Sequence, residues 1–427
     1  MGHLTYGNYR RMQRRLSQYV PGNVDSSTLY EILKVLVTDE EARLCSLMPI
    51  RLASAAELAR IWKIPEPEAA AALDELAHKG IVYVFDDNGT KKHALAPPVL
   101  GFFEFSLMRT DGRFDPETLS KLYHQYNNVE EGFIRQQGAS WPAFTRVLPH
   151  EDMLDDMTSE VMCWERVSEG IENASCITTG QCFCRHKMEH MGLACDAPMD
   201  VCLTFNDTAR YLSSHGIARE ISKDEARRII RECMDAGLVQ IGENKKSSLV
   251  IICNCCGCCC DLLLGYKKFG LDHIVSPSSY AATMDPRSCT KCGTCAKRCP
   301  VDAITLPPGQ VPVVSERCLG CGVCARFCPT GSCQLTGRPE KVYVPEDFLE
   351  KWALGGVYQA KLGNFFFDDQ TSRLHQVLRS VTNATLRLPF VRSFLLSKPV
   401  RTTLLSAVRN SSRFREFKDS PPLRSEA

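Results

Sequence analysis

The sequence predicts an α+β chain that is divided into several units. Apolar residues recur at helical spacing between about residues 25 and 80, and strand-forming residues follow them. The 23 cysteines are distributed unevenly, since only Cys45 precedes residue 163 and none follows Cys333. A length of 427 residues, with 44% hydrophobic and 24% charged residues, is typical of a globular protein with about two to four domains.

The first unit is expected to consist of helices followed by a hairpin. The segment SSTLYEILKVL carries a serine cap and a leucine stripe, and SAAELARIW and EPEAAAALDELAHKG continue the helical spacing. IVYVF, the turn DDNG and KKHALA then predict two strands. This order of elements resembles the winged-helix family, so we expect residues 1–135 to form a winged-helix-like domain.

A second copy of this pattern is expected within residues 136–275. EARRIIRECMDAGLVQIGEN, from Glu225, can be laid over EAAAALDELAHKGIVYVFDDN, from Glu68, and in each segment a glycine follows the glutamate by twelve residues. We expect Gly80 and Gly237 to end their helices in the left-handed conformation that glycine tolerates best. With a serine cap at Ser222, the segment from about 206 to 253 predicts a second winged-helix-like unit. Chance similarity between two amphipathic helices is the alternative.

Two cysteine runs near the C-terminal side have the most specific spacing in the chain. CTKCGTCAKRCP and CLGCGVCARFCP each follow C-x2-C-x2-C-x3-C-P. Over residues 283–335 they resemble the bacterial two-cluster ferredoxins. The resemblance implies a βαββαβ module at residues 280–340 with two 4Fe-4S clusters, in which the fourth cysteine of each run serves the other cluster. One cluster would then be bound by Cys289, Cys292, Cys295 and Cys328, and the other by Cys318, Cys321, Cys324 and Cys299.

A further set of cysteines lies in the middle of the chain. It comprises the pair in CFC, the single residues Cys195 and Cys202, and the run CNCCGCCC. Thiolates select zinc, copper or iron–sulfur clusters. The run contains two interleaved C-x2-C registers, so one loop could supply two sites, or one cluster together with spare redox thiols. The candidate ligands are Cys182, Cys184, Cys195, Cys202, Cys253, Cys255, Cys256, Cys258, Cys259 and Cys260.

We expect these cysteines to bind a third iron–sulfur cluster, of 4Fe-4S or less ordinary type. Structural zinc, assisted by His186 or His190, and disulfide exchange chemistry are the alternatives. For the two histidines, four residues apart, the favoured prediction is a solvated or salt-bridged helix face.

The charge distribution suggests where partners could bind. Between Pro286 and Pro339 there are seven basic residues and two acidic ones, so we expect the module to face an anionic group: another domain, its own clusters, or a redox partner protein with an acidic docking surface. Residues 341–427 predict a helical basic tail, with eleven Arg and Lys against three acids after residue 370. This tail either clasps its own chain or makes peripheral contact with a membrane. PEDFLEKWALGG and NFFFDDQ are expected to pack against the ferredoxin-like module.

The predicted function is electron transfer through two 4Fe-4S clusters and an additional cysteine-ligated centre, to or from a partner oxidoreductase. No phosphate loop, dinucleotide fingerprint or nucleophile elbow is present, so we expect an electron carrier or an electron-transfer component of an oxidoreductase, and a reductase acting at the middle site is an alternative. Another is a redox-responsive winged-helix transcription regulator. Residues 54–89 contain seven acids and three bases, which makes DNA an unlikely partner.

The expected location is the cytoplasm. The N-terminal segment MGHLTYGNYRRMQRRLSQY lacks the apolar core of a signal peptide, and no apolar run approaches the roughly 18 residues of a membrane-spanning helix. Cysteines in such a compartment are metal ligands or redox groups rather than disulfides.

Overall fold

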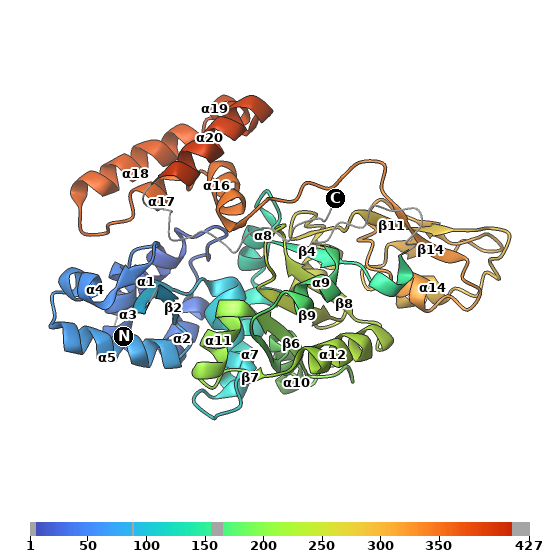
Figure 1. The fold of residues 1–427 in the computed structure, drawn as a ribbon, viewed down its shortest axis with the longest axis horizontal. Coiled ribbons are helices and arrows are strands. Elements are labelled where there is room, and N and C mark those ends of the chain that lie inside the picture. The colour runs from blue at the N-terminus through green and yellow to red at the C-terminus, as the bar shows by residue number, and fades with distance from the viewer. Residues whose placement is uncertain (1–5, 88, 155–164, 412–427) are drawn as a thin grey trace. The chain divides into compact units, whose positions relative to one another are not determined.

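The computed structural model describes residues 6–87, 89–154 and 165–411 (Figure 1). The chain divides into two compact units. The first takes the residues up to Trp141, Tyr211–Ala218 and the segment from Phe348 onward. The second takes Pro142–Arg210 and Arg219–Asp347, and it contains all the cysteines of the candidate sites.

The N-terminal part of the first unit has the predicted order of helices and hairpin. A three-stranded antiparallel sheet has the order β1-β3-β2. Ser26 caps α2 by accepting a hydrogen bond from the Thr28 amide, and Ser54 forms a capping box with Glu57 at the start of α4. The elements are α1 Gly7–Leu16, α2 Ser27–Leu36, α3 Asp39–Leu47, β1 Ala53–Ser54, α4 Ala55–Trp62, α5 Glu66–His78, β2 Val82–Asp87 and β3 Thr90–Leu95.

The first unit is completed by helices from two parts of the chain. After the hairpin come η1 Pro98–Phe102, α6 Phe103–Met108, α7 Pro116–His124, η2 Gln125–Val129 and α8 Gly132–Gly138. The C-terminal segment supplies α16 Phe348–Tyr358, α17 Gly363–Phe366, α18 Arg373–Leu386, α19 Pro389–Leu396 and α20 Lys398–Asn410. None of the described helices combines the length and the apolar character that crossing a bilayer requires.

The C-terminal helices contact the N-terminal segment, and the expectation that they pack against the ferredoxin-like module is wrong. Lys361 Nζ donates to the Tyr19 carbonyl at 3.0 Å, and Asn364 Nδ2 donates to the Gln18 carbonyl at 2.9 Å. The Trp352 and Tyr19 rings meet edge to face at 6.2 Å. The aromatic residues of this segment therefore complete the core of the first unit.

A seven-stranded sheet forms the centre of the second unit, in the order β10-β4-β8-β9-β6-β5-β7. Its core is apolar and includes Leu203, Phe205 and Ile252. The strands are β4 Thr145–Leu148, β5 Ile177–Gln181, β6 Asp200–Phe205, β7 Arg219–Glu220, β8 Val239–Glu243, β9 Ile251–Cys255 and β10 Val275–Ser276. The helices are η3 Glu151–Met153, α9 Val167–Glu172, α10 Phe183–His190, α11 Asn206–Ser214, α12 Lys223–Asp235 and α13 Asp261–Phe269, of which α11 extends into the first unit.

The internal repeat is visible at the level of single elements. Helices α5 and α12 both have 13 residues, and the glycines that follow them have positive φ angles, 80° at Gly80 and 78° at Gly237. The two hairpins belong to different sheets. The strands after α5, β2 and β3, lie in the three-stranded sheet, whereas those after α12, β8 and β9, pair with each other and are inner strands of the seven-stranded sheet. The repeat thus comprises a helix, a glycine turn and a hairpin.

A small module completes the second unit. Its elements are β11 Tyr280–Met284, α14 Thr294–Arg298, β12 Ile304–Thr305, β13 Val313–Val314, α15 Val323–Arg326 and β14 Cys333–Gly337. The outer strands β11 and β14 pair antiparallel, as do the inner strands β12 and β13. Each cysteine run supplies a loop and the short helix that follows it, so the two halves of the module have matching elements.

Candidate metal centres

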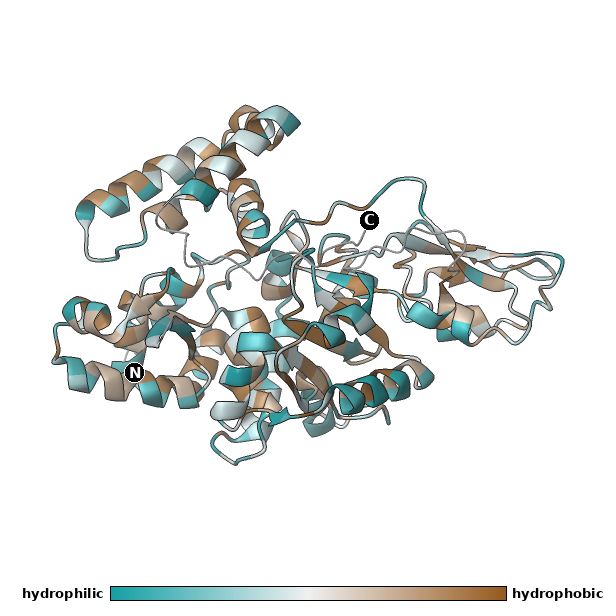
Figure 2. Ribbon diagram, in the orientation of Figure 1, coloured by the Kyte–Doolittle hydropathy of each residue, from teal (hydrophilic) through white to brown (hydrophobic). Residues whose placement is uncertain are grey.

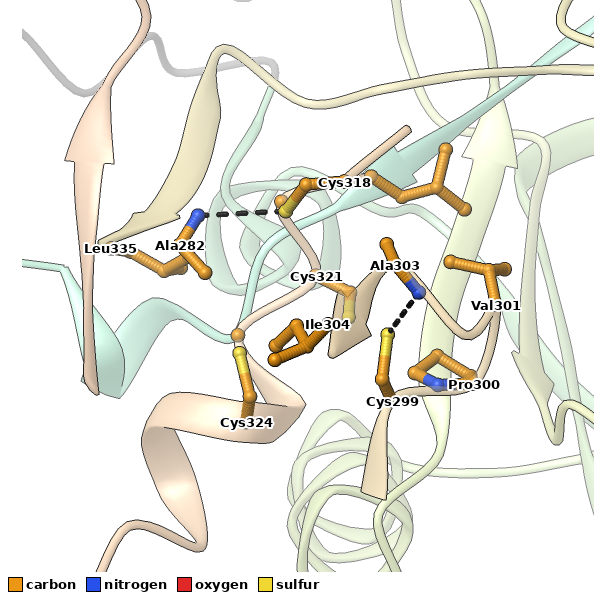
Figure 3. A pocket seen from close by; sticks show the side chains of 13 residues that line it. Ala282, Cys299, Pro300, Val301, Ala303, Ile304, Cys318, Cys321, Cys324 and Leu335 are labelled. Atoms are coloured by element: carbon orange, nitrogen blue, oxygen red, sulfur yellow. Dashed lines mark hydrogen bonds between the residues drawn. The ribbon is translucent and has the colours of Figure 1, made fainter. Parts of the chain in front are cut away.

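Cysteines from both runs line one cavity of the small module (Figure 3). Cys318, Cys321 and Cys324 come from the second run, and Cys299 comes from the end of the first. About 310 Å³ at this site, including space open to solvent, is not filled by atoms. Two backbone amides donate to its sulfurs, Ala303 N to Cys299 Sγ at 3.2 Å and Ala282 N to Cys318 Sγ at 3.5 Å. Amides aimed at sulfur stabilise anionic thiolates.

A second cavity is the counterpart of the first. It is lined by Cys289, Cys292 and Cys295 of the first run, by Cys328 of the second and by Cys333, and about 290 Å³ there, including space open to solvent, is not filled by atoms. The Cys333 amide donates to Cys328 Sγ at 3.3 Å, as the Ala303 amide does to Cys299 in the other half. Each cavity thus contains three cysteines of one run and the fourth of the other.

Both donor sets fit an iron–sulfur cluster. Four cysteine thiolates are the usual ligands of a 4Fe-4S centre, and three of them on one loop leave the fourth to a distant residue. The hydroxyl of Thr294 lowers the pKa of the Cys292 thiol. Burial acts to raise the pKa of Cys328, but backbone amides, that of Cys333 foremost, hold it below its ordinary value. These contacts favour the ionised form that binds iron.

Residues 281–329 match the family model of a 4Fe-4S dicluster domain. The match includes both cysteine runs and accounts for the paired cavities. No curated protein and no solved structure matches the chain. The dicluster domain is therefore an iron–sulfur module, and the remainder of the chain has to be interpreted from its own residues.

Outside the dicluster domain, the middle cysteines form two groups. The first, here called the four-thiol site, consists of Cys195, Cys256, Cys258 and Cys259, whose sulfurs all lie within 4.8 Å of one another. The Sγ atoms of Cys258 and Cys259 are 3.7 Å apart, and those of Cys259 and Cys195 are 3.9 Å apart. Cys259 is buried, whereas Cys258 is exposed to solvent.

The second group is a series of side-chain contacts between buried or half-buried thiols, here called the inner thiol row. Cys202 contacts Cys253, Cys253 contacts Cys255, Cys255 contacts Cys260, and Cys260 contacts Cys184. Strand pairing explains the first contact, because β6 and β9 pair Leu203 with Ile252 and so bring Cys202 opposite Cys253. The sixth member, Cys182, interacts electrostatically with Cys253 and Cys260.

This division differs from both sequence registers. Cys253 and Cys255 share one face of β9 and belong to the inner thiol row. Beyond the strand, a turn places Cys256, Cys258 and Cys259 in the four-thiol site. Cys195 and Cys202, which the sequence suggested as partners of CFC in one set, lie in different groups.

A buried arginine lies between the two groups. Arg185 is fully buried on α10, and its Nη1 donates to the Asn254 carbonyl at 2.9 Å and lies 3.9 Å from Cys256 Sγ. Its Nε and Nη2 atoms have no hydrogen-bond partner. Burial acts to lower the pKa of the guanidinium, but the neighbouring thiols, Cys182 and Cys256 foremost, keep it above its ordinary value. Such a group fits beside an anion.

Arg185 and Lys187 did not enter the sequence-based site, and the favoured prediction of a solvated or salt-bridged face for His186 and His190 is wrong for His186. The sequence signal for Arg185 was a cation placed directly after CFC, at the start of a helix. Lys187, also fully buried, forms an ion pair with Asp261 next to Cys260. His186 and His190 contact each other through their Nε2 atoms at 3.2 Å, and His186 is buried rather than solvated.

The middle cysteines and the dicluster domain are in direct contact. A Cβ atom at Gly257 would lie 2.3 Å from the carbonyl oxygen of Pro300, so only glycine fits at this point of the run. Pro300 directly follows Cys299, which lines the first cavity. The turn that contains the four-thiol site therefore packs against the loop that contains Cys299.

Proposed function

We propose that the protein transfers electrons through the two 4Fe-4S clusters of its dicluster domain and through a third cluster bound by the inner thiol row. The contact between Gly257 and Pro300 carries this proposal. Gly257 lies in the turn of the four-thiol site, two residues after Cys255 of the inner thiol row, and its contact brings this part of the cysteine run next to a cluster-binding loop. Electrons passing between centres need such close approach, so the two cysteine-rich regions form one path.

The inner thiol row has the chemistry of a cluster site. It contains six cysteines, and a cluster needs about four cysteine ligands. Their sulfurs extend in a row, which suits ligands that bind different irons. A cluster with four thiolate ligands is anionic, and the buried Arg185 supplies a compensating charge with two free N–H groups. Cys184, Cys255 and Cys260, which contact one another in succession, are the ligands we expect to matter most.

We further propose a redox partner protein with an acidic docking surface in the cytoplasm. Some of the basic residues of the dicluster domain serve the chain itself. Arg326 pairs with Asp152 and Asp235, and Arg317 stacks on the Tyr266 ring with 4.5 Å between its Cζ atom and the ring centroid. Arg298 likewise stacks on the Phe327 ring at 4.2 Å, so the exposed Lys297 at the end of α14 is the cation that we assign to the partner.

The experiment is iron and acid-labile sulfide quantification on the anaerobically purified full chain, followed by electron paramagnetic resonance after reduction. We expect about twelve sulfides per chain, eight from the dicluster domain and four from the third cluster. Cys184→Ser and Cys255→Ser should each remove the third signal and leave the other two, whereas Cys45→Ala in the first unit should change none. A sulfide content of about eight, unchanged by these substitutions, would refute the third cluster.

A further inference from the structure

We propose that the four-thiol site binds a single tetrahedral metal ion, zinc or iron, rather than a cluster. This site is separate from the inner thiol row, and the inference stands whether or not the chain transfers electrons. It assigns to Cys195, Cys256, Cys258 and Cys259 a chemistry different from that of the other cysteines.

The separation of the sulfurs carries the proposal. A zinc–thiolate bond is about 2.3 Å long, so two ligands at the corners of a tetrahedron lie about 3.8 Å apart. In the four-thiol site the Cys258–Cys259 and Cys259–Cys195 sulfur separations are 3.7 Å and 3.9 Å, and no pair of sulfurs is more than 4.8 Å apart. The four sulfurs are therefore close enough to share one central ion after small side-chain movements.

The dicluster domain provides an internal comparison. In a cubane each thiolate binds a different iron, so the four ligand sulfurs surround the core and stand farther apart than ligands of one ion. Within residues 6–87, 89–154 and 165–411, the four-thiol site is the one place where three or more such ligand atoms lie within 4.8 Å. The eight cysteines of the two runs fall in this part of the chain and do not meet that condition.

The local backbone explains how adjacent cysteines reach one ion. Neighbouring side chains on a strand point to opposite faces, but β9 ends at Cys255 and residues 257–259 form a turn. The Cys260 amide donates to the Cys256 carbonyl at 3.4 Å and closes this turn. Cys258 and Cys259 can then converge on Cys195, which lies in the loop between α10 and β6. A bound ion would join this loop to the turn that packs on Pro300.

The test is metal and sulfide analysis of the full chain and of the double variant Cys195→Ala/Cys258→Ala, each dialysed against a chelator under anaerobic conditions. We expect the variant to lose one zinc or one iron per chain and to keep its sulfide. Cys176→Ala, at a cysteine outside both groups, is the matched control and should lose nothing.

Element analysis distinguishes zinc from iron, and either supports the proposal. Loss of about four irons together with about four sulfides would show a cluster and overturn it. Equal metal content in the variant and the wild type would overturn it as well. The paramagnetic signals of the clusters, recorded on the same samples, show separately whether the proposed electron-transfer centres are present.

A second inference rests on α18 and α19. Of the eleven exposed large hydrophobic residues in the described part of the chain, seven belong to these helices or to the residue between them. They are Leu374, Val377, Leu378, Val381, Leu388, Phe390 and Phe394. Phe390 and Phe394 are 72% and 63% exposed. Figure 2 shows hydrophobic segments along these helices.

Helix α18 contacts α17 through Asn383, and a row of its apolar residues is exposed together with polar ones such as Arg373 and Gln376. Asn383 donates to Asn364 Oδ1 at 2.8 Å and accepts from the Gly363 amide at 2.9 Å. The exposed residues Leu374, Val377, Leu378 and Val381 follow the spacing i, i+3, i+4, i+7, so they share one helix face. A water-soluble surface helix has the opposite arrangement, and the apolar face of α18 therefore requires a partner.

We infer that this partner is an anionic lipid surface. Residues 370–410 contain seven Arg and Lys and no Asp or Glu. Arg379, Arg392 and Arg409 contact Gln18, Tyr358 and Glu350 of the protein itself, and the remaining cations suit anionic headgroups around inserted apolar side chains. A second copy of the chain is disfavoured, because an isologous contact would bring two such cationic surfaces together. Phe390 and Phe394, one turn apart, are the residues we expect to enter the headgroup layer.

The test is co-sedimentation of the full chain with vesicles of phosphatidylcholine, with and without phosphatidylglycerol. We expect binding that needs phosphatidylglycerol and falls with salt. Phe390→Ser/Phe394→Ser should weaken it more than about tenfold. Val129→Ser, at an exposed valine of the same unit, should leave it unchanged. Failure to bind these vesicles, binding equal in the double variant, or vesicle-independent self-association through this face would overturn the inference.

Discussion

At the scale of single residues, Arg185 has the clearest expected effect on redox chemistry. Its buried guanidinium lies beside the middle thiols, and a positive charge there stabilises the reduced, more negative state of a cluster. The interaction energy of two unit charges a few ångström apart is about 1–4 kcal/mol, and the substitution removes one such interaction. We expect Arg185→Gln to lower the midpoint potential of the third cluster by roughly 50 mV or more. A redox titration followed by paramagnetic resonance measures this, with Arg228→Gln on the exposed face of α12 as the control.

Cys328 tests which cysteines share a cluster. It lines the cavity of Cys289, Cys292 and Cys295, although it belongs to the other run. We expect Cys328→Ser to perturb the cluster of that cavity and to leave the signal of the other cluster intact. Cys299→Ser should have the reciprocal effect, and damage confined to the cluster of its own run would contradict the crossed arrangement.

At the scale of elements, the contact between Gly257 and Pro300 can be tested by a single methyl group. Gly257 does not have a positive φ, so alanine there is opposed by the steric contact with the Pro300 carbonyl rather than by backbone strain. We expect Gly257→Ala to cost about 1–3 kcal/mol of stability and to alter the signal of the cluster that Cys299 serves. Chemical denaturation and paramagnetic resonance provide the measurements.

Gly337 is the matched control for this substitution. It lies in the same unit, also lacks a positive φ, and nothing stands within 4 Å of a Cβ atom built on it. Gly337→Ala should therefore leave both the stability and the cluster signals unchanged. An equal effect at both positions would contradict the steric explanation.

Local patterns predicted elements well and long-range pairing poorly. The serine caps at Ser26 and Ser54 and the glycine turns at Gly80 and Gly237 act through neighbouring residues, so the sequence suffices to place them. The large sheet joins strands far apart in the chain, such as β4 with β10, and short strands carry no signal of their partners. The same limitation applied to the middle cysteines, because the register of β6 and β9 decides that Cys202 meets Cys253.

At the scale of the whole molecule, the winged-helix-like order of the N-terminal elements raises the question of DNA binding. In the winged-helix arrangement expected from the sequence, α5 would be the recognition helix, and it carries Glu66, Glu68, Asp74 and Glu75. Phosphate contacts require clustered cations and give affinity that falls steeply with salt. We expect the full chain to show no more than weak background binding to duplex DNA in a fluorescence anisotropy titration. Sub-micromolar binding at physiological salt would instead support a redox-responsive regulator.

The exchange of cysteines between the two cavities of the dicluster domain also affects how the protein acquires and loses iron. Neither cluster can be completed by one run alone, so insertion of the first must wait until both halves of the domain have come together. Oxidative damage to one cluster should also affect the other. Disassembly of one cluster releases a thiol beside the ligands of the other, where it can be oxidised. The domain should therefore mature and decay as a pair of clusters, with little accumulation of the single-cluster form.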